Sequence, residues 1–175
     1  MGDEDVGPVN NFLHSMFSQI DVSLNGTLVS SSTSTYAYRA YIENLLTYGP
    51  AAKTSQLTAA LFYKDTAGRM DVTEPNLADQ ANRNLGLTSR ARLARESRTI
   101  DMIGRVHSDL FFQERYMLNE VNVKIRLARS KDAFCLMSRN NTPFKVKIHS
   151  AALYIRKVKL SPSVFLAHAK TLETD

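Results

Sequence analysis

The sequence predicts a mainly β fold with helical insertions, and two observations predict it. Most of the segments between residues 99 and 160 alternate apolar and polar residues, which is the pattern of strands that bury one face. Near the N-terminus, a hairpin pattern leads directly into an amphipathic helix pattern. A helix that follows a hairpin, in a chain otherwise made of strands, indicates a helical insertion in a β-sandwich of the jelly-roll type.

The hairpin is predicted from residues 15–30. Ile20, Val22 and Leu24 alternate with polar residues, which predicts a strand over residues 15–24. Asn25-Gly26 then predicts a tight two-residue turn, because both central residues of such a turn need a positive φ. Residues 27–30 are the expected return strand.

A helical insertion is predicted over residues 34–64. Five apolar residues recur there at spacings of three and four, so we expect them to form one helix face that packs against the edge of a sheet. The alternative is that the tyrosines among them stack on nucleic-acid bases. Gly49-Pro50 is expected to end this helix, and Ser55 to begin a second, shorter one. The predicted apolar face consists of Tyr38, Tyr41, Ile42, Leu45 and Leu46.

Residues 65–97 show no lasting period, which predicts a long irregular loop. Gly68, Pro75 and Gly86 interrupt this segment. A loop of this length in a compact domain is usually functional or flexible. Its end is rich in arginine, which we expect to be a solvated face or a contact between subunits, with phosphate binding as the alternative. These arginines are Arg90, Arg92, Arg95 and Arg98.

Strand patterns return after residue 99. We expect strands over residues 100–106, with a bulge at Gly104, and over residues 121–128, where one face is apolar and the other basic. Residues 133–137 form a short apolar run, and a turn is expected over residues 139–143.

The C-terminal part of the chain predicts two more strands and a helix. Alternation predicts strands over residues 144–149 and 152–160. Ser161-Pro162 predicts the start of the helix, because serine is a preferred N-cap and proline fits the first helical position. The expected apolar stripe of this helix is Val164, Phe165, Ala169 and Leu172.

The chain is mildly basic, with a formal net charge of +5. Lys145 and Lys147 alternate with apolar residues, which is what the outward face of a sheet requires. Lysine also protects an exposed sheet edge from pairing with another chain. We therefore expect these basic strand faces to be solvated, and we do not expect nucleic acid as a partner.

The chain also carries features that indicate its compartment. Its apolar runs are all shorter than the roughly 18 residues of a membrane-spanning helix, and its N-terminus is acidic, unlike a secretory signal. The single cysteine, Cys135, lies in an apolar segment and is expected to be a buried small hydrophobe, as in a reducing compartment. We expect an intracellular protein that is neither secreted nor inserted in a membrane.

No catalytic constellation is visible in the sequence. A Gly-rich phosphate loop, a Gly-x-Ser-x-Gly elbow and a His-Glu-x-x-His motif are all missing, and the acidic residues 3–5 are expected to be a solvated tail. We assign no catalytic, cofactor-binding or metal-binding residues, and we expect neither an enzyme nor a small-molecule substrate. The histidines are too widely spaced for a zinc-ligand motif, namely His14, His107, His149 and His168.

Four blocks of the sequence resemble the major capsid protein of Maverick/Polinton elements, which are virus-like DNA transposons. The blocks cover residues 9–28, 38–49, 101–113 and 156–170. This family is similar to the double jelly-roll capsid proteins of large eukaryotic DNA viruses, in which a helix following a strand–turn–strand unit is inserted in the first barrel. The resemblance implies an incomplete jelly-roll β-sandwich, part of a double jelly roll, in a truncated copy of the protein.

The resemblance implies a domain organisation and a structural function. Residues 1–150 would form a partial first jelly roll, with the helical insertion at about residues 34–64 and the loop 65–97 exposed or at a trimer contact. Residues 151–175 would be the opening strand and helix of a second, truncated jelly roll. Such proteins form trimeric, pseudo-hexagonal capsomers of an icosahedral shell, with a minor capsid protein as a further partner, in a virion or inside the cell.

Two other functions remain open from the residues. One is a domesticated jelly-roll module that binds a sugar or a protein without building a shell. The other is a nucleic-acid-binding protein that uses residues 90–98 and the face of Lys145 and Lys147.

Overall fold

The structure, a computed structural model, describes residues 6–139 and 143–173, and it contains both helices and antiparallel sheets. About 36% of the residues are helical and 14% are in strands, so the balance is mixed and the expected predominance of strands is not supported. The chain divides into two compact units, Met1–Lys145 and Val146–Asp175, which are described separately below. The acidic residues 3–5 lie outside the described residues.

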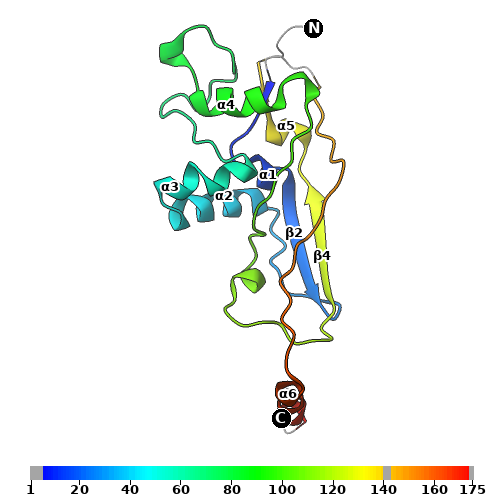
Figure 1. Cartoon of the computed structure of the whole chain (residues 1–175). Coiled ribbons are helices and arrows are strands. Elements are labelled where there is room, and N and C mark those ends of the chain that lie inside the picture. The colour runs from blue at the N-terminus through cyan, green and yellow to red at the C-terminus, as the bar shows by residue number, and fades with distance from the viewer. Residues whose placement is uncertain (1–5, 140–142, 174–175) are drawn as a thin grey trace. The chain divides into compact units, whose positions relative to one another are not determined.

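The predicted hairpin is confirmed. Strand β2 (Phe17–Leu24) pairs antiparallel with β3 (Thr27–Leu28). The two turn residues have positive φ, 48° at Asn25 and 86° at Gly26, as this kind of turn requires. The strand predicted over residues 121–128 is also confirmed as β4 (Val123–Arg129), which pairs antiparallel with the other edge of β2. The sheet therefore has the order β3-β2-β4 (Figure 1).

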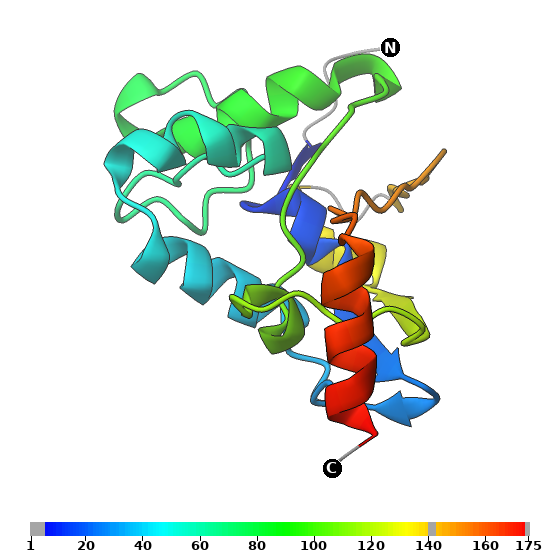
Figure 2. The same ribbon diagram turned by 60° about the horizontal axis from the view of Figure 1, so that its bottom comes forward.

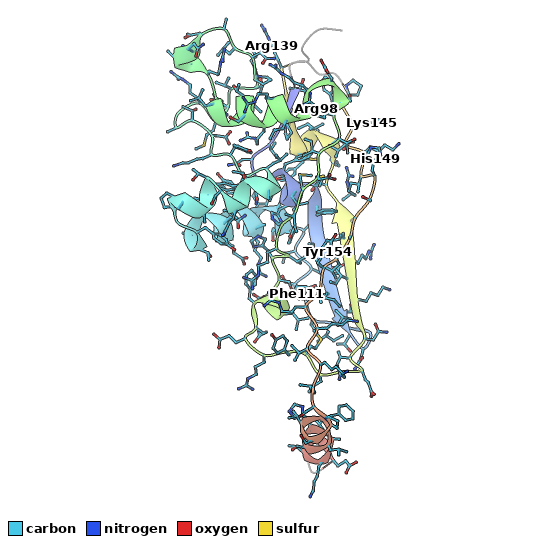
Figure 3. The ribbon with its side chains drawn as sticks, viewed as in Figure 1. Arg98, Phe111, Arg139, Lys145, His149 and Tyr154 are labelled. Atoms are coloured by element: carbon cyan, nitrogen blue, oxygen red, sulfur yellow. The ribbon has the colours of Figure 1, made fainter. Side chains whose placement is uncertain are left out.

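Helix α2 (Tyr36–Thr47) lies against β2 and forms the core of the first unit with it (Figure 1). Ile20 and Val22 of β2 are buried against Tyr36 and Ala40 of α2. Phe111, labelled in Figure 3, reaches this core from the 3-10 helix η4 (Asp109–Phe112). Partly buried side chains surround the core, namely Phe17, Val106, Leu110, Phe111 and Ile125.

The helix is where the sequence predicts it, but the predicted face is wrong. Tyr38, Ile42, Leu45 and Leu46 are exposed. The buried residues of α2 are instead Tyr36, Ala37, Ala40 and Asn44. The physical reason is close packing, because small side chains let a helix approach a strand that already carries branched residues such as Ile20 and Val22.

The end of α2 differs from the prediction in detail. Gly49-Pro50 follows the helix, but Pro50 is itself the first residue of a short helix, α3 (Pro50–Lys53), where its missing N–H costs nothing. The second helix expected after Ser55 is a 3-10 helix, η1 (Gln56–Ala60). It ends at Leu61, whose φ of 56° is left-handed.

The prediction of an irregular loop over residues 65–97 is wrong in its last third. After a short 3-10 helix, η2 (Gln80–Asn82), the chain forms α4 (Leu85–Ala94) and then a 3-10 turn, η3 (Arg95–Ser97). The side chain of Asn84 caps α4 by accepting a hydrogen bond from the Leu87 amide at 3.3 Å. Gly86 belongs to this helix, where it allows the close approach of the Tyr63 and Lys64 carbonyl groups.

A second, two-stranded sheet lies next to α4. Strand β1 (Val6–Pro8) pairs antiparallel with β5 (Leu136–Ser138), close to α1 (Phe12–Ser15) and α5 (Asp132–Cys135). The apolar run at residues 133–137 is thus split between a helical turn and a strand. Cys135 is fully buried, as predicted.

The strand predicted over residues 100–106 is wrong. These residues form no regular element in the described structure, and Gly104 is not a bulge. A Cβ atom at Gly104 would lie 2.7 Å from a methyl group of Leu13 and 3.1 Å from Nε2 of His14, so the backbone packs directly on α1. The segment is held by tertiary packing, which no periodic pattern reveals.

The two strands predicted over residues 144–149 and 152–160 are also not formed, since residues 143–160 have no regular secondary structure. The turn expected at residues 139–143 falls partly outside the described residues. In the second unit, the final helix is confirmed as α6 (Pro162–Leu172), with Pro162 at the first helical position (Figure 2). Its expected apolar stripe is exposed, like all of residues 149–173.

Candidate functional site

A buried polar cluster joins α1, α2 and the segment before η4. We call it the histidine cluster. It is built around two imidazole rings, His14 from α1 and His107 from the irregular segment, which are both buried and meet edge to face with centroids 4.7 Å apart. Four side chains surround them, and the members are His14, His107, Tyr36, Glu43, Arg39 and Asp109.

The hydrogen bonds define which atoms carry protons. The Tyr36 hydroxyl oxygen accepts a hydrogen bond from the backbone N–H of His107 at 3.5 Å. The Tyr36 hydroxyl lies 3.0 Å from Nδ1 of His14, and we assign it as the donor of this hydrogen bond because its oxygen already accepts from His107. Nδ1 of His107 lies 2.6 Å from a carboxylate oxygen of Glu43, which can only accept, so this nitrogen donates.

Burial controls the charge of this cluster. Desolvation, with a further contribution from nearby His107, lowers the pKa of His14 to about 3, so its imidazole is neutral at physiological pH. Desolvation also raises the pKa of Tyr36 to about 12. The Tyr36 hydroxyl is therefore protonated and serves as a donor.

Arg39 extends the cluster to the surface. Its guanidinium contacts Glu43 at 2.6 Å and Asp109 at 2.5 Å. The hydrogen bonds with Asp109 and Glu43 raise the pKa of Arg39, and the hydrogen bond from Arg39 lowers the pKa of Asp109. Arg39 thus links helix α2 to the start of η4 by a pair of opposite charges.

A shallow hollow that is open to solvent lies beside the cluster. Gln19 lines it and accepts hydrogen bonds from the backbone and the hydroxyl of Ser34 at 3.2 and 3.1 Å. The hydroxyls of Thr33 and Thr35 bond to each other at 2.7 Å. These polar groups in the hollow thus hydrogen-bond to one another. In the described part of the chain, no group of three or more His, Cys, Asp or Glu is arranged to hold a metal ion.

The outer face of α2 is an exposed apolar surface. We define it by Tyr38, Ile42, Leu45 and Leu46, of which Leu46 is 82% exposed. The Tyr38 ring meets Phe134 of α5 edge to face at 5.7 Å, which continues the surface onto a neighbouring element. Contiguous apolar surface of this kind is rare on monomeric proteins and marks interaction sites.

The second unit carries another exposed apolar surface, which we call the tail surface. Tyr154, labelled in Figure 3, is 84% exposed in the segment before α6. On α6 itself, Leu166 is 67% exposed. The members of the tail surface are Leu153, Tyr154, Ile155, Val158, Leu160, Val164, Phe165, Leu166 and Leu172.

One of the four arginines of the predicted basic segment does not reach the surface. Arg90 is fully buried, where it donates to the carbonyl oxygens of Pro8 and Tyr63 and pairs with Asp65 at 2.7 Å. The prediction that Arg90 is solvated or free to contact phosphate is therefore wrong. Arg92, Arg95 and Arg98 are exposed.

Sequence reasoning missed the histidine cluster. His14 and Tyr36 are 22 positions apart, and His107 and Glu43 are 64 positions apart. No local spacing could have connected them, because the fold of β2 and α2 brings them together. The sequence gave no signal that His14 and His107 are buried.

Comparison with known proteins gives one curated relative. The chain is 31% identical over 149 residues to the uncharacterised protein F54H12.2 of Caenorhabditis elegans. The match covers 84% of this chain but 32% of F54H12.2, so the chain spans about a third of the length of that relative. No protein-family model and no solved structure matches the chain. Among residues 6–139 and 143–173, no helix combines the length and the apolar character needed to cross a membrane.

Proposed function

We propose that this chain is part of a structural subunit that assembles through its exposed apolar surfaces, as a capsid protein of the Maverick/Polinton type does. The observation that carries the proposal is the contrast within α2. This helix packs Tyr36 and Ala40 against β2 and leaves four other large apolar residues uncovered, namely Tyr38, Ile42, Leu45 and Leu46. An exposed helix would normally carry polar residues at those positions, so the pattern favours a second covering layer.

The tail surface supports the same proposal from the second unit. Residues 152–160 have the alternation of a strand, yet they are exposed and unpaired in the described structure. Backbone N–H and C=O groups of such a segment gain most by pairing with a strand from another chain or from further polypeptide. In this proposal, residues 151–175 are the opening strand and helix of a second jelly roll.

The two small antiparallel sheets are the parts of the first jelly roll in this proposal. A closed jelly roll has eight strands in two sheets, and these sheets have two and three strands. F54H12.2 is about three times as long as the matched region, so a protein of its length has room for the missing strands. The finished subunit would form a pseudo-hexagonal trimer and tile a shell, in a virion or inside the cell, with no catalytic function.

The test is the association state of the chain and of two variants of α2. Ile42→Glu/Leu46→Glu places charges on the outer face of α2, and Thr47→Glu places one at a neighbouring exposed polar position. We expect the original chain and Thr47→Glu to self-associate as their concentration rises, measured by light scattering, because the outer face of α2 is uncovered in both. We expect the double variant to stay monomeric with unchanged circular dichroism. A monomeric, cooperatively folded original chain at all concentrations would overturn the proposal.

The nucleic-acid alternative keeps one supporting observation, which is the exposure of Arg92, Arg98 and Lys145. Figure 3 shows Arg98 and Lys145 toward the same end of the first unit. Binding through such residues weakens steeply with salt, because phosphate contacts release counterions. A gel-shift titration at low salt tests it. Absence of a shift excludes this function, and a salt-sensitive shift lost in Arg98→Gln/Lys145→Gln favours it over assembly alone.

A further inference from the structure

We propose that the histidine cluster is an acid-released latch, in which protonation of His14 below about pH 6 frees the segment 98–113 from α1 and α2. The latch goes beyond the proposed function and does not depend on it. It rests on how the two imidazoles are placed where α1, α2 and the segment 98–113 meet.

Burial and its assigned hydrogen bond favour the neutral form of His14. Nδ1 of His14 accepts the Tyr36 hydroxyl proton at 3.0 Å, while the Tyr36 oxygen accepts the backbone N–H of His107. A proton on Nδ1 would place two donors face to face, and the Tyr36 hydroxyl would have to turn away from its buried partner. A buried donor without an acceptor is costly, so the protonated form disfavours this geometry.

The second imidazole makes protonation of His14 still more unfavourable. The His107 ring lies 4.7 Å from that of His14 and is itself buried. Glu43 accepts from the far nitrogen, Nδ1 of His107, at 2.6 Å. The nearest carboxylate thus contacts His107 and not His14, so it does not neutralise a charge on His14 directly.

The groups that face the two rings come from every element packed on them. Tyr36, Arg39 and Glu43 come from α2, and Arg39 carries the positive charge nearest to Glu43. The ring centroid of Phe112 in η4 lies 6.0 Å from that of His107. The guanidinium carbon of Arg105 lies 4.0 Å from the centroid of the Phe112 ring. Asp109 pairs with Arg39. Arg39 is paired with both carboxylates, so neither Glu43 nor Asp109 is a carboxylate without a cation that could neutralise a charge on His14.

The segment that carries His107 is the part that we expect to detach from α1 and α2. Its described residues 99–108 form no strand or helix. Ile103 donates one backbone hydrogen bond to the Ala59 carbonyl at 3.1 Å, and Gly104 packs on Leu13 and His14. Segments held by few backbone bonds open locally at lower free energy than a paired sheet.

Release of the segment would uncover apolar surface. Val106, Leu110 and Phe111 pack against Ile20 and Val22, so their departure exposes one side of the core. Protonation of His14 is thereby coupled to exposure of an apolar face of β2. The latch couples acid to the surface that the protein presents to its partners.

The size of the response follows from linkage. His14 in the open state has the ordinary imidazole pKa of about 6.5, whereas in the closed state it is held neutral. The opening equilibrium should therefore increase about tenfold between pH 7.5 and pH 5.5 and roughly a hundredfold by pH 4.5. Above about pH 7 the response should vanish, because both states are then neutral.

The test compares hydrogen exchange in the full chain with that of two variants. His14→Phe/Tyr36→Phe replaces both bonded groups by apolar rings of similar shape, which removes the titration of residue 14. The backbone N–H of His107 loses its acceptor in this variant, so we expect more opening at every pH but no rise toward acid from residue 14. His168→Gln removes an exposed imidazole from α6 as the matched control. The measured quantity is the opening equilibrium of residues 98–113, corrected for the intrinsic exchange rate. It should rise about tenfold between pH 7.5 and 5.5 in the original chain and in His168→Gln. It should not change with pH in the double variant. An equally steep rise in the double variant overturns the latch.

A second measurement needs no variant. Nitrogen-15 spectra of the histidine rings in the original chain report the protonation of each imidazole. We expect His14 to be neutral with its proton on Nε2 at pH 7, and to become charged only together with exchange of residues 98–113. A His14 ring that titrates near the ordinary imidazole value while the segment stays protected would overturn the proposal, even where the double variant fails to fold.

Discussion

The hydroxyl of Tyr36 lies 3.0 Å from Nδ1 of His14, and this contact ties the first turn of α2 to α1. Both residues are buried, so neither group has water as an alternative partner. The same hydroxyl oxygen accepts from the backbone of His107. One phenol thereby satisfies two groups that come from two distant parts of the chain.

Tyr36→Phe should destabilise the protein by about 1–3 kcal/mol, because it leaves Nδ1 of His14 and the His107 amide buried without this partner. Urea unfolding followed by circular dichroism measures the change. Tyr38→Phe on the same helix is the control, since Tyr38 is 59% exposed, and it should change stability by less than about 0.5 kcal/mol. Equal effects of the two substitutions would show that the buried hydroxyl contributes nothing special.

Arg90→Met should be more severe, with a loss of about 3–5 kcal/mol, because it breaks a buried ion pair. The guanidinium holds the Pro8 and Tyr63 carbonyls and Asp65 together, and its side chain has no exposed surface. Burial lowers the pKa of Arg90 while Asp65 acts to raise it, so the pair depends on both partners. The measurement is again the free energy of unfolding in urea.

The exposed Arg92 on the same helix provides the control for Arg90. Arg92→Met removes the same charge and adds the same side chain, but it should change stability by less than about 0.5 kcal/mol. If Arg90→Met were as mild as Arg92→Met, the carbonyl groups of β1 and of residue 63 would have to find other donors, and the role assigned to Arg90 would be wrong.

Gly86→Ala should destabilise the protein although alanine favours helices by about 1 kcal/mol over glycine. A Cβ atom at this position would lie 2.5 Å from the Lys64 carbonyl oxygen and 2.8 Å from that of Tyr63, and both are backbone atoms that cannot swing aside. We expect a net loss of about 1–3 kcal/mol. Gly49→Ala has no atom within 4 Å of the added carbon and loses only the N-cap preference of glycine at the start of α3, so it should cost less, about 0.5 kcal/mol. A stabilising Gly86→Ala would contradict the close approach.

The features that the sequence predicts correctly are local. The turn at Asn25 and Gly26 depends on the positive φ of two adjacent residues, and the start of α6 depends on Ser161 and Pro162. Steric preferences of neighbouring residues decide such features, so a short stretch of sequence is sufficient. The alternation within β2 and within β4 could also be predicted from local sequence, but the pairing of the two strands could not.

The features that the sequence misses depend on tertiary contacts. The apolar residues of α2 predict that Ile42 and Leu46 face the sheet, yet Ala40 is the residue packed against Val22. Gly86 resembles a helix breaker, yet it is the point where α4 approaches the chain at Lys64. In both cases the available space, and not the hydrophobicity of the side chain, decides the outcome. The histidine cluster is missed for a related reason, because its partners meet only in the folded chain.

Glu43→Gln should change how stability depends on acid. Burial acts to raise the pKa of the Glu43 carboxyl, but hydrogen bonds from His107 and Arg39 outweigh it and lower the pKa. A carboxylate with a lowered pKa stabilises the fold above its unfolded-state pKa and loses that contribution as pH falls through the folded value. Glu43→Gln should therefore be less stable at pH 7 and lose less stability below about pH 5 than the original chain. Urea unfolding at a series of pH values measures both curves, with the exposed Glu114→Gln as the control that should follow the original chain. Parallel curves for Glu43→Gln and the original chain would mean that the carboxylate contacts of His107 and Arg39 do not stabilise the folded state.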